Sequence, residues 1–248
     1  MGLSSNTIIH FTSTKEALKG ILSNNFNLKY CKETVKWSAK STAQLHVPMV
    51  SFCDIPLSQI KDHISKYGHY GIGLSRKWAL KNKLNPVLYV EPDSHLANSY
   101  QSILAHYAES PEIYNENAEV IDRIVDILRY VKNYEGLLTR SGKAKAKYRY
   151  SDEREWRFVP QYNSDCQMYY SEKAFNADGI KEEANQSLSK ISLKFEPNDV
   201  KYIIIKSDNE ISEFIEHLRI AKGNKYTQSD IERLTTRLLT TKQIHDDI

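Results

Sequence analysis

The chain has 248 residues, of which 40% are hydrophobic and 26% charged, as is typical of a soluble globular protein large enough to bury a core. Its formal net charge of +3 is too small to indicate nucleic acid as a partner by bulk electrostatics, although it does not exclude one. The three cysteines are widely spaced and no apolar run approaches the roughly 18 residues of a membrane span, so we expect a reducing, cytoplasmic setting without a membrane.

Strands and helices are predicted in alternation over the first third of the chain. Runs of β-branched and aromatic residues predict strands at residues 7–11, 26–31, 47–55, 70–74 and 87–90. Helices are expected at residues 13–24, 57–67 and 76–83. The first helix would begin at a capping box, in which Ser13 is followed three residues later by Glu16. Residues 33–46 have no clear period and predict a loop.

The remainder of the chain changes character. A helical insertion is expected at residues 94–138, followed by strands at 156–159, 190–195 and 200–206 and by helices at 211–221 and 227–242. Thr227 and Asp230 form the capping box of the last helix. These patterns predict an α+β fold with a mainly antiparallel sheet. The core domain would span residues 1–206, with C-terminal helices at 207–248 packed on it.

The first candidate site is the end of the first predicted strand, where His10 and Thr12 lie two residues apart. On a strand both side chains point to one face, where they could hydrogen-bond a ribose or another diol. The alternative is a structural histidine beside a turn that a hydroxyl stabilises, and the residues alone favour it.

The second candidate is YSDEREWRFVP, residues 150–160, where acids and bases directly precede an apolar run. On a strand Glu153 and Glu155 share a face, and Glu155 is expected to be the more buried of the two. A buried carboxylate has a raised pKa unless it is paired, and could then act as a base or stabilise a developing cation. The alternative is a cross-strand ion pair of Glu155 with Arg157, Lys147 or Arg149.

The third candidate is YGHYGIGLS, residues 67–75. Tyr67 and Tyr70 could stack on a flat ring such as nicotinamide or adenine. Gly71 and Gly73 do not complete a GxGxxG dinucleotide loop and fall inside a predicted strand. We therefore expect these glycines to allow close packing of the strand.

The fourth candidate is a basic stretch at residues 140–149, which predicts a flexible loop that could bind a phosphate backbone or a pyrophosphate. The alternative is an ordinary solvated loop. Its basic residues are Arg140, Lys143, Lys145, Lys147 and Arg149.

Thiol and metal chemistry are not indicated. Cys53 lies in an apolar predicted strand, where thiols are usually inert core residues, so a cysteine protease with His46 is rejected. The eight histidines show no HExxH or paired-cysteine spacing, so we expect no metal site.

Several segments together resemble the AbiGi family of abortive-infection proteins. They are VSFCDIPLSQ (50–59), YGHYGIGLSRKWA (67–79), NPVLYV (85–90), YSDEREWRFVP (150–160) and FEPNDVKYIII (195–205). The resemblance extends from His10 to the closing TTKQIHDD. It implies the antitoxin side of a phage-resistance toxin–antitoxin pair, with a cognate toxin or a phage-derived protein as the partner.

The stretch HFTSTKEALKGILSNNFNLKY, residues 10–30, is also similar, more weakly, to the opening of ADP-ribosyltransferase-like folds, although Asn25 and Phe26 stand where Gly-Leu is usual. This resemblance implies NAD as the cofactor. His10 and its neighbour would hold the ribose, and a tyrosine or serine of a middle strand would pack on the nicotinamide. The implied cofactor-binding residues are His10, Thr12, Tyr67, Tyr70 and Ser75.

The same resemblance implies catalytic roles for His10, Glu153 and Glu155. The bond to nicotinamide would lengthen into an oxocarbenium-like state that the Glu155 carboxylate stabilises. Glu153 would position the nucleophile of an unknown acceptor, and the basic stretch favours an anionic one. On this interpretation Glu155→Gln abolishes transfer and leaves the fold intact.

Three functions are therefore weighed: an ADP-ribosyltransferase, a non-catalytic antitoxin that binds a toxin or DNA, and a nuclease. A DNA repressor is disfavoured because the last helix has no strongly basic face, and a nuclease because residues 152–155 alone supply no metal–carboxylate cluster. An enzyme is expected to turn His10 and Glu155 toward one cleft. A binding module is expected to expose an apolar patch along residues 94–138.

Overall fold

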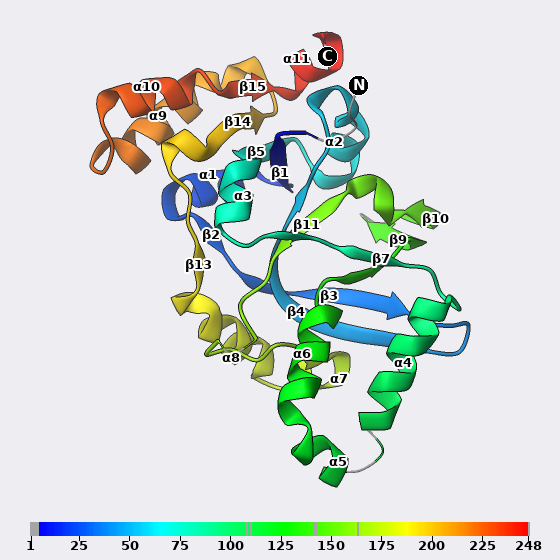
Figure 1. Cartoon of the computed structure of the whole chain (residues 1–248). Helices are drawn as coiled ribbons and strands as arrows, with labels where there is room; N and C mark the ends of the chain where they lie inside the picture. The colour runs from blue at the N-terminus through cyan, green and yellow to red at the C-terminus, as the bar shows by residue number, and fades with distance from the viewer. Residues whose placement is uncertain (1–4, 108, 110, 141–142, 163, 248) are drawn as a thin grey trace. The chain divides into compact units, whose positions relative to one another are not determined.

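The computed structural model describes residues 5–107, 109, 111–140, 143–162 and 164–247 and has an α+β fold (Figure 1). The chain divides into two compact units. Unit 1 comprises Met1–Asn27, Ser51–Asn85 and Ser192–Ile248, and unit 2 comprises Leu28–Val50 and Pro86–Ile191. We describe each unit by itself.

The sheet of unit 1 has the strand order β15-β14-β5-β1. Its strands are β1 (Thr7–Thr12), β5 (Tyr70–Ser75), β14 (Val200–Ile205) and β15 (Leu238–Thr240). β1 pairs with β5 and β5 with β14 antiparallel, whereas β14 and β15 are parallel. The prediction of a mainly antiparallel sheet is confirmed for these strands.

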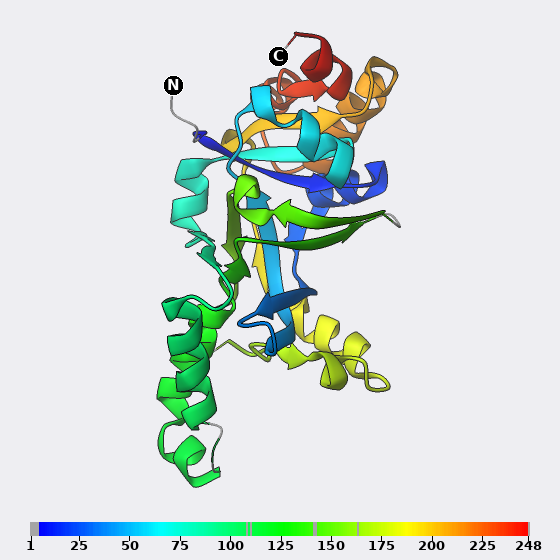
Figure 2. The same cartoon turned by 90° about the vertical axis from the view of Figure 1, so that its right-hand side faces the viewer.

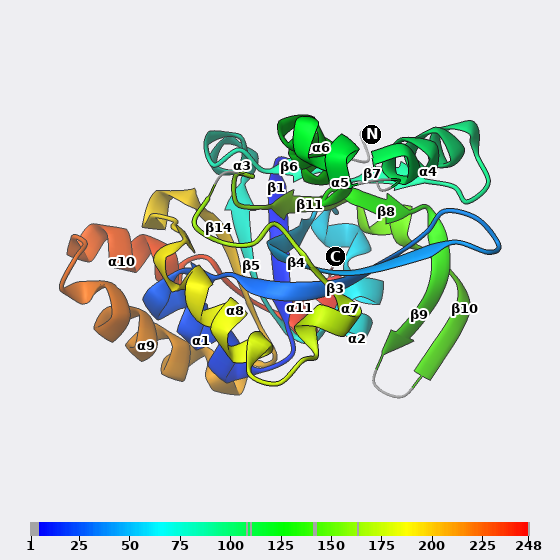
Figure 3. The same ribbon diagram turned by 90° about the horizontal axis from the view of Figure 1, so that it is seen from below.

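Helices flank this sheet because its strands are apolar on both sides. Ile203, Ile204 and Ile205 are consecutive and fully buried, which requires cover on each face. Leu18 and Phe214 are among the buried residues on the covering helices. The helices of unit 1 are α1 (Lys15–Asn24), α2 (Lys61–Tyr67), α3 (Arg76–Lys81), α9 (Ile211–Gly223), α10 (Gln228–Thr235) and α11 (Thr241–Asp247). Figure 3 shows α9 and α10 side by side.

Two glycines let β5 pack closely against its neighbours. A Cβ atom at Gly73 would lie 2.9 Å from the ring of Tyr202 and 3.0 Å from the methyl of Thr7. A Cβ atom at Gly71 would lie 3.1 Å from the carbonyl oxygen of His10. The expectation that these glycines serve close strand packing is therefore confirmed.

The C-terminal segment differs from the single helix predicted at residues 227–242. Thr227 and Asp230 do cap α10, but α10 ends at Thr235. Residues Leu238–Thr240 form β15, which pairs parallel to β14 and leads into α11. Their strand pairing is a long-range contact, and the continued helical period in the sequence does not reveal it. The predicted cap of α1 was also one residue early, because Thr14 accepts from the Ala17 N–H.

In unit 2 residues 33–46 form a β-hairpin, so the predicted loop was wrong. β3 (Lys29–Lys36) and β4 (Thr42–Cys53) pair antiparallel from Lys29 opposite Met49 to Lys36 opposite Thr42. Val35 and Trp37 are buried while their neighbours are exposed or half-buried. This alternation is a strand signal that the many charged residues obscured.

The predicted helical insertion ends ten residues early. Its helices are α4 (His95–Tyr107), α5 (Pro111–Glu116) and α6 (Ala118–Leu128). Beyond them β8 (Val131–Asn133) pairs parallel to β7 (Leu88–Val90). The buried amide of Asn133 fixes this pairing, because it accepts from the Lys36 N–H at 2.7 Å and donates to the Val90 carbonyl at 3.2 Å.

The basic stretch is a hairpin and not the predicted flexible loop. β9 (Glu135–Arg140) and β10 (Lys143–Arg149) run side by side as a two-stranded antiparallel ribbon (Figure 2). The pairing shifts register between Lys145 and Tyr148. Residues 141 and 142 of the predicted loop lie outside the described residues.

The shorter elements complete the fold. The strand predicted at 190–195 shrinks to two residues that pair with β2, and the strand predicted at 156–159 is confirmed within one residue. These elements are β2 (Phe26–Asn27), β6 (Asn85–Pro86), β11 (Glu155–Phe158), β12 (Tyr170–Ser171), β13 (Ser192–Leu193), α7 (Glu172–Phe175) and α8 (Ile180–Ser187).

Candidate functional site

His10 lies half-buried on β1 of unit 1, among aromatic side chains. Its Nδ1 lies 2.8 Å from the carbonyl oxygen of Ser51, so this nitrogen carries the proton and donates. The ring meets the edges of Phe26 and Phe52 at centroid distances of 5.3 and 5.6 Å. Burial lowers the pKa of His10 more than the hydrogen bond to Ser51 raises it, so the imidazole is neutral at pH 7.

Three of the predicted cofactor residues share one face of the β1–β5 pair. Thr12 lies opposite Tyr70 and His10 lies opposite Ile72, and residues directly opposite in an antiparallel pair point to the same side. The hydroxyl of Tyr70 donates to Glu210 at 2.9 Å. Burial and this carboxylate raise the pKa of Tyr70 to about 12, so the hydroxyl stays protonated.

The other two predicted cofactor residues lie elsewhere in unit 1. Ser75 is opposite Thr7, on the other face of the β1–β5 pair, and its hydroxyl caps α3 by accepting from the Trp78 N–H at 3.2 Å. Tyr67 ends α2, and its ring stacks on His63 with centroids 5.2 Å apart. These two residues are therefore not brought onto the face that carries His10.

Glu153 and Glu155 do not share a strand, so the premise that a strand aligns them was wrong. Glu153 ends a 3₁₀ turn at Tyr150–Glu153, and Arg154 has a left-handed φ of 46°. β11 begins only at Glu155. The αL residue turns the chain between the two carboxylates, which a pattern of alternating residues does not reveal.

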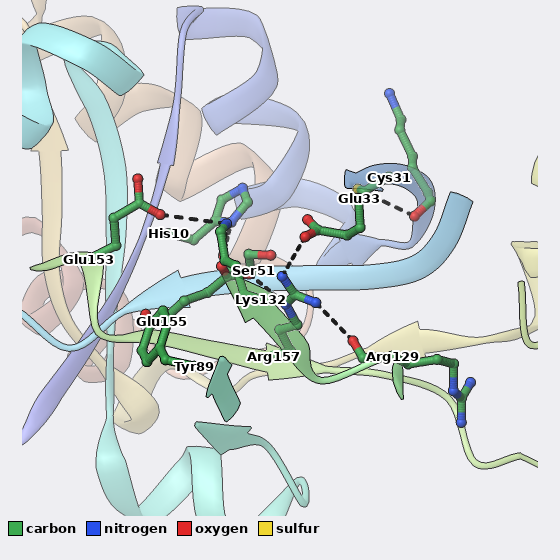
Figure 4. A network of polar contacts seen from close by, with 11 residues as sticks. His10, Cys31, Glu33, Ser51, Tyr89, Arg129, Lys132, Glu153, Glu155 and Arg157 are labelled. Carbon is green, nitrogen blue, oxygen red and sulfur yellow. Dashed lines mark hydrogen bonds and ion pairs between the residues drawn. The ribbon is translucent and has the colours of Figure 1, made fainter. Parts of the chain in front are cut away.

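Lys132 of β8 nevertheless brings the two carboxylates together (Figure 4). Its Nζ lies 2.7 Å from Oε2 of Glu155 and 3.7 Å from Oε2 of Glu153. The ring centroid of Tyr150 lies 5.1 Å from the same nitrogen. Lys132 was not predicted, because residues 131–138 read as helix.

Arg157 forms the second cationic centre of this cluster. Its Nε donates to Oε1 of Glu155 at 2.7 Å, and its Nη2 lies 2.9 Å from Glu33. Its Nη1 donates to the carbonyl oxygen of Arg129 at 2.8 Å (Figure 4). We call Glu33, Lys132, Glu153, Glu155 and Arg157 the charge cluster of unit 2. Of the basic residues considered as partners of Glu155, Arg157 is the one that the described contacts contain, and it pairs within β11 and not across strands as expected.

The charge cluster is buried, yet its central groups are ionised. Glu155 is 5% exposed and Arg157 is 0% exposed. Burial alone would raise the pKa of Glu155, but Arg157 and Lys132 together lower it well below its usual range. Burial alone would lower the pKa of Arg157, but Glu155 and Glu33 raise it further above its usual value. The Glu155 carboxylate is therefore ionised at neutral pH and is not a base poised near that pH.

The basic hairpin carries the predicted anion-binding residues. Lys147 and Arg149 are exposed, and the Arg149 guanidinium lies 5.8 Å from the centroid of the Tyr134 ring. Lys143 pairs with Arg140 next to the hairpin tip, and Lys145 pairs with Leu138. All five basic residues thus belong to one two-stranded ribbon.

Neither a metal-binding group nor a membrane-spanning helix is present among the described residues. No group of three or more His, Cys, Asp and Glu side chains in this part of the chain is arranged to hold a metal ion. None of the described helices combines the length and the apolar character that crossing a bilayer requires.

Comparisons with known proteins identify the family. Residues 24–206 match the family model described as "Putative abortive phage resistance protein AbiGi, antitoxin". A protein of Lactococcus lactis subsp. cremoris named "Abortive phage resistance protein AbiGi" is 26% identical over 239 residues, which cover 87% of this chain and 95% of the relative. No solved structure matches the chain, so the ADP-ribosyltransferase-like fold stays a prediction. The chain belongs to the AbiGi family of abortive phage resistance proteins.

Proposed function

We propose that this protein is an antitoxin that neutralises a cognate toxin by binding it and not by catalysis. The observation that carries the proposal is the state of Glu155, the residue on which a catalytic role would depend. Both of its carboxylate oxygens are engaged, one by Arg157 and one by Lys132, each at 2.7 Å. The family description, which names an antitoxin, supports the antitoxin role.

The charge cluster acts in this account as a structural element. Removing one member of a buried ion pair typically costs about 3–5 kcal/mol, because the remaining charge is left without a partner. A substrate that recruited Glu155 would have to displace Arg157 or Lys132 at a cost of that kind. A surface that binds a partner leaves the cluster intact.

Complex formation in cells tests the proposal. The chain is expressed together with the toxin gene of its own locus, and growth and co-purification are measured. We expect restored growth and a stable complex of both proteins. Restored growth without any complex, accompanied by covalent modification of the toxin, would contradict binding as the mechanism.

A second candidate function is transfer of ADP-ribose from NAD, favoured by the common face of His10, Thr12 and Tyr70 on β1 and β5. In this account His10 and Thr12 hold the ribose and Tyr70 packs on the nicotinamide. The Glu155 carboxylate, which is ionised at neutral pH, stabilises the oxocarbenium-like state, and Glu153 orients the acceptor. The basic hairpin binds an anionic acceptor, whereas Tyr67 and Ser75 lie off the face that carries His10 and take no part in this account.

Calorimetric titration with NAD tests this second candidate. Binding by the wild-type protein that is weakened at least tenfold in His10→Ala would support it. If no heat of binding is measured at millimolar NAD, the second candidate function is ruled out.

A further inference from the structure

The ribbon of β9 and β10 in unit 2 carries the excess positive charge of the chain. Residues 135–149 contain five Lys or Arg residues and one Asp or Glu residue, a net charge of +4 in a chain whose net charge is +3. The charges of the remaining residues therefore nearly balance. A positive charge that is gathered on one element, and not spread over the surface, is typical of a site that binds a polyanion.

Two of these basic residues are presented to solvent at the base of the ribbon. Lys147 and Arg149 flank Tyr148, which is 3% exposed, and both are themselves exposed. Because side chains alternate along a strand, the two cations point away from the face that Tyr148 buries. Glu135, the one acid of the ribbon, is opposite Arg149, yet no ion pair among the described residues includes Lys147 or Arg149. Their charges are therefore not compensated within the chain.

Aromatic side chains hold the base of the ribbon in place. The ring of Tyr148 meets the ring of Tyr150 edge-on, with centroids 5.3 Å apart, and the hydroxyl of Tyr150 donates to the carbonyl oxygen of Leu137 at 2.7 Å. A Cβ atom at Gly136 would lie 3.0 Å from the Tyr150 ring, so ring and strand are in close contact. The register shift between Lys145 and Tyr148 puts two residues opposite one, which strengthens the twist of a ribbon. The basic residues thus stand on an anchored, twisted element.

The shape of this element favours duplex DNA among the polyanions. Of the described strands, β9 and β10 pair only with each other. Such a two-stranded ribbon fits the major groove of B-DNA, which is about 12 Å wide. The major groove of A-form RNA is too narrow for side chains to enter, and a flat membrane surface offers no groove.

Single-stranded nucleic acid is a poorer match. It binds by stacking its bases on exposed aromatic rings. At this ribbon Tyr148 is buried, and the guanidinium of Arg149 already lies over the Tyr134 ring, 5.8 Å from its centroid. The exposed groups of the ribbon are therefore suited to phosphates and not to unpaired bases.

We infer that the β9–β10 ribbon binds duplex DNA, with its basic residues contacting phosphates along the major groove. This inference goes beyond toxin binding and does not depend on it. It also assigns DNA binding to an element other than the C-terminal helices, which lack a strongly basic face. The contacting residues are Arg140, Lys143, Lys145, Lys147 and Arg149.

Salt dependence of DNA binding tests the inference. The probe is a labelled duplex of mixed sequence and about 20 base pairs, and its anisotropy is measured with the full chain from about 50 to 200 mM salt. Each phosphate contact adds roughly 0.9 to the slope of log K against log salt, so five contacts predict a slope of about −4.5. We expect Lys147→Gln/Arg149→Gln to bring that slope about 2 closer to zero and to weaken binding at least tenfold at about 100 mM salt.

Two further variants separate the ribbon from bulk charge. Lys77→Gln/Lys81→Gln removes the same two charges from exposed positions on α3 of unit 1 and should bind as wild type does. Lys147→Arg/Arg149→Lys keeps both charges on the ribbon and should also bind as wild type, because phosphate contacts require charge and not one particular side chain. Equal losses in the two glutamine variants would overturn the inference.

Unlabelled competitors identify the polyanion. Duplex DNA should displace the probe at least tenfold better than duplex RNA of the same sequence, poly-glutamate or vesicles of anionic lipid. Any of these that displaces the probe as well as DNA does would overturn the choice of DNA and assign the ribbon to that class of partner. An unchanged slope in Lys147→Gln/Arg149→Gln, or no binding by wild type at about 10 μM chain and about 50 mM salt, would overturn the ribbon as a binding site.

Discussion

Glu155 and its partners define the chemistry of unit 2 at the scale of single residues. The carboxylate lies between two cations, Arg157 and Lys132, and is almost fully removed from solvent. Glu33 and Glu153 complete the cluster, so three carboxylates surround two cations. A strand end rich in acids and bases thus enters the core because its charges compensate one another there.

The first prediction concerns Glu155→Gln. The substitution removes the carboxylate that both cations contact at 2.7 Å and leaves Arg157 with Glu33 and Lys132 with Glu153. Because two charge-assisted hydrogen bonds are weakened while each cation keeps a carboxylate, the free energy of unfolding should fall by about 1–3 kcal/mol. This replaces the sequence-based expectation that the variant keeps its fold intact. Urea unfolding at pH 7 measures the change, with Glu119→Gln on the exposed face of α6 as the control that should stay near wild type. Equal stability of the two variants would contradict a structural role for the cluster.

The second prediction is a pH dependence. The pKa of Glu155 is depressed in the folded protein, whereas the unfolded chain binds the proton near pH 4.3, roughly the value of an unperturbed Glu. The stabilisation from this group is therefore present above that pH and is lost as the pH falls below it toward the folded pKa. The free energy of unfolding, measured from pH 7 to pH 3, should decline more steeply in wild type than in Glu155→Gln. Parallel curves would contradict the assignment.

The members of the cluster show what the sequence can and cannot reveal about a site. Arg157 was expected as one of three possible cross-strand partners of Glu155, and the two residues pair within one strand. Lys132 and Glu33 were not considered, because only the folded chain brings β8 and β3 to β11. The turn at Arg154 escaped prediction because a non-glycine residue with φ of 46° has no reliable sequence signal.

Close strand packing organises unit 1 at the scale of the elements. Gly73 lies where β5 passes between Thr7 of β1 and Tyr202 of β14. Helical segments and buried strands such as β1, β5 and β14 were predictable from local periodicity. The hairpins β3–β4 and β9–β10 were not predictable in this way. Their charged residues are typical of loops, and each strand forms because it pairs with its partner strand.

The third prediction follows from this packing. Gly73→Ala puts a methyl group 2.9 Å from the Tyr202 ring and should lower the free energy of unfolding by about 1–3 kcal/mol. Gly20→Ala is the matched control, because apart from its chain neighbours and the backbone of α1 itself no atom lies within 4 Å of the added methyl. That control should raise stability by roughly 0.5–1 kcal/mol, since alanine is the better helix former. Thermal unfolding compares them, and a neutral Gly73→Ala would contradict the close approach.

The fourth prediction concerns the strand that replaced the expected helix. Asn133→Ala removes the amide that joins β8 to the backbone of Lys36 and Val90, and leaves buried backbone groups without a partner. The free energy of unfolding should fall by about 1–3 kcal/mol. Asn98→Ala on the exposed side of α4 should change little. A loss no larger than that of Asn98→Ala would show that the amide does not fix the strand.

The whole molecule combines a mixed, mostly antiparallel sheet with the helices α4, α5 and α6, which expose apolar residues. From the sequence, a binding module was expected to expose an apolar patch along residues 94–138. Leu96 and Ile103 on α4 and Val120 and Ile127 on α6 are exposed, which puts four apolar side chains of this segment at the surface. The chain belongs to a family of abortive phage resistance proteins, which gives the molecule a biological setting in phage resistance.

The most direct measurement of the central claim is the stoichiometry of neutralisation. Purified chain is added to the purified toxin in rising molar ratio, with and without NAD, and the remaining toxin activity is measured. A binding antitoxin should remove activity linearly until one chain is present per toxin molecule, with no effect of NAD. Loss of activity far below equimolar chain, and only when NAD is present, would contradict the account and identify the protein as an enzyme.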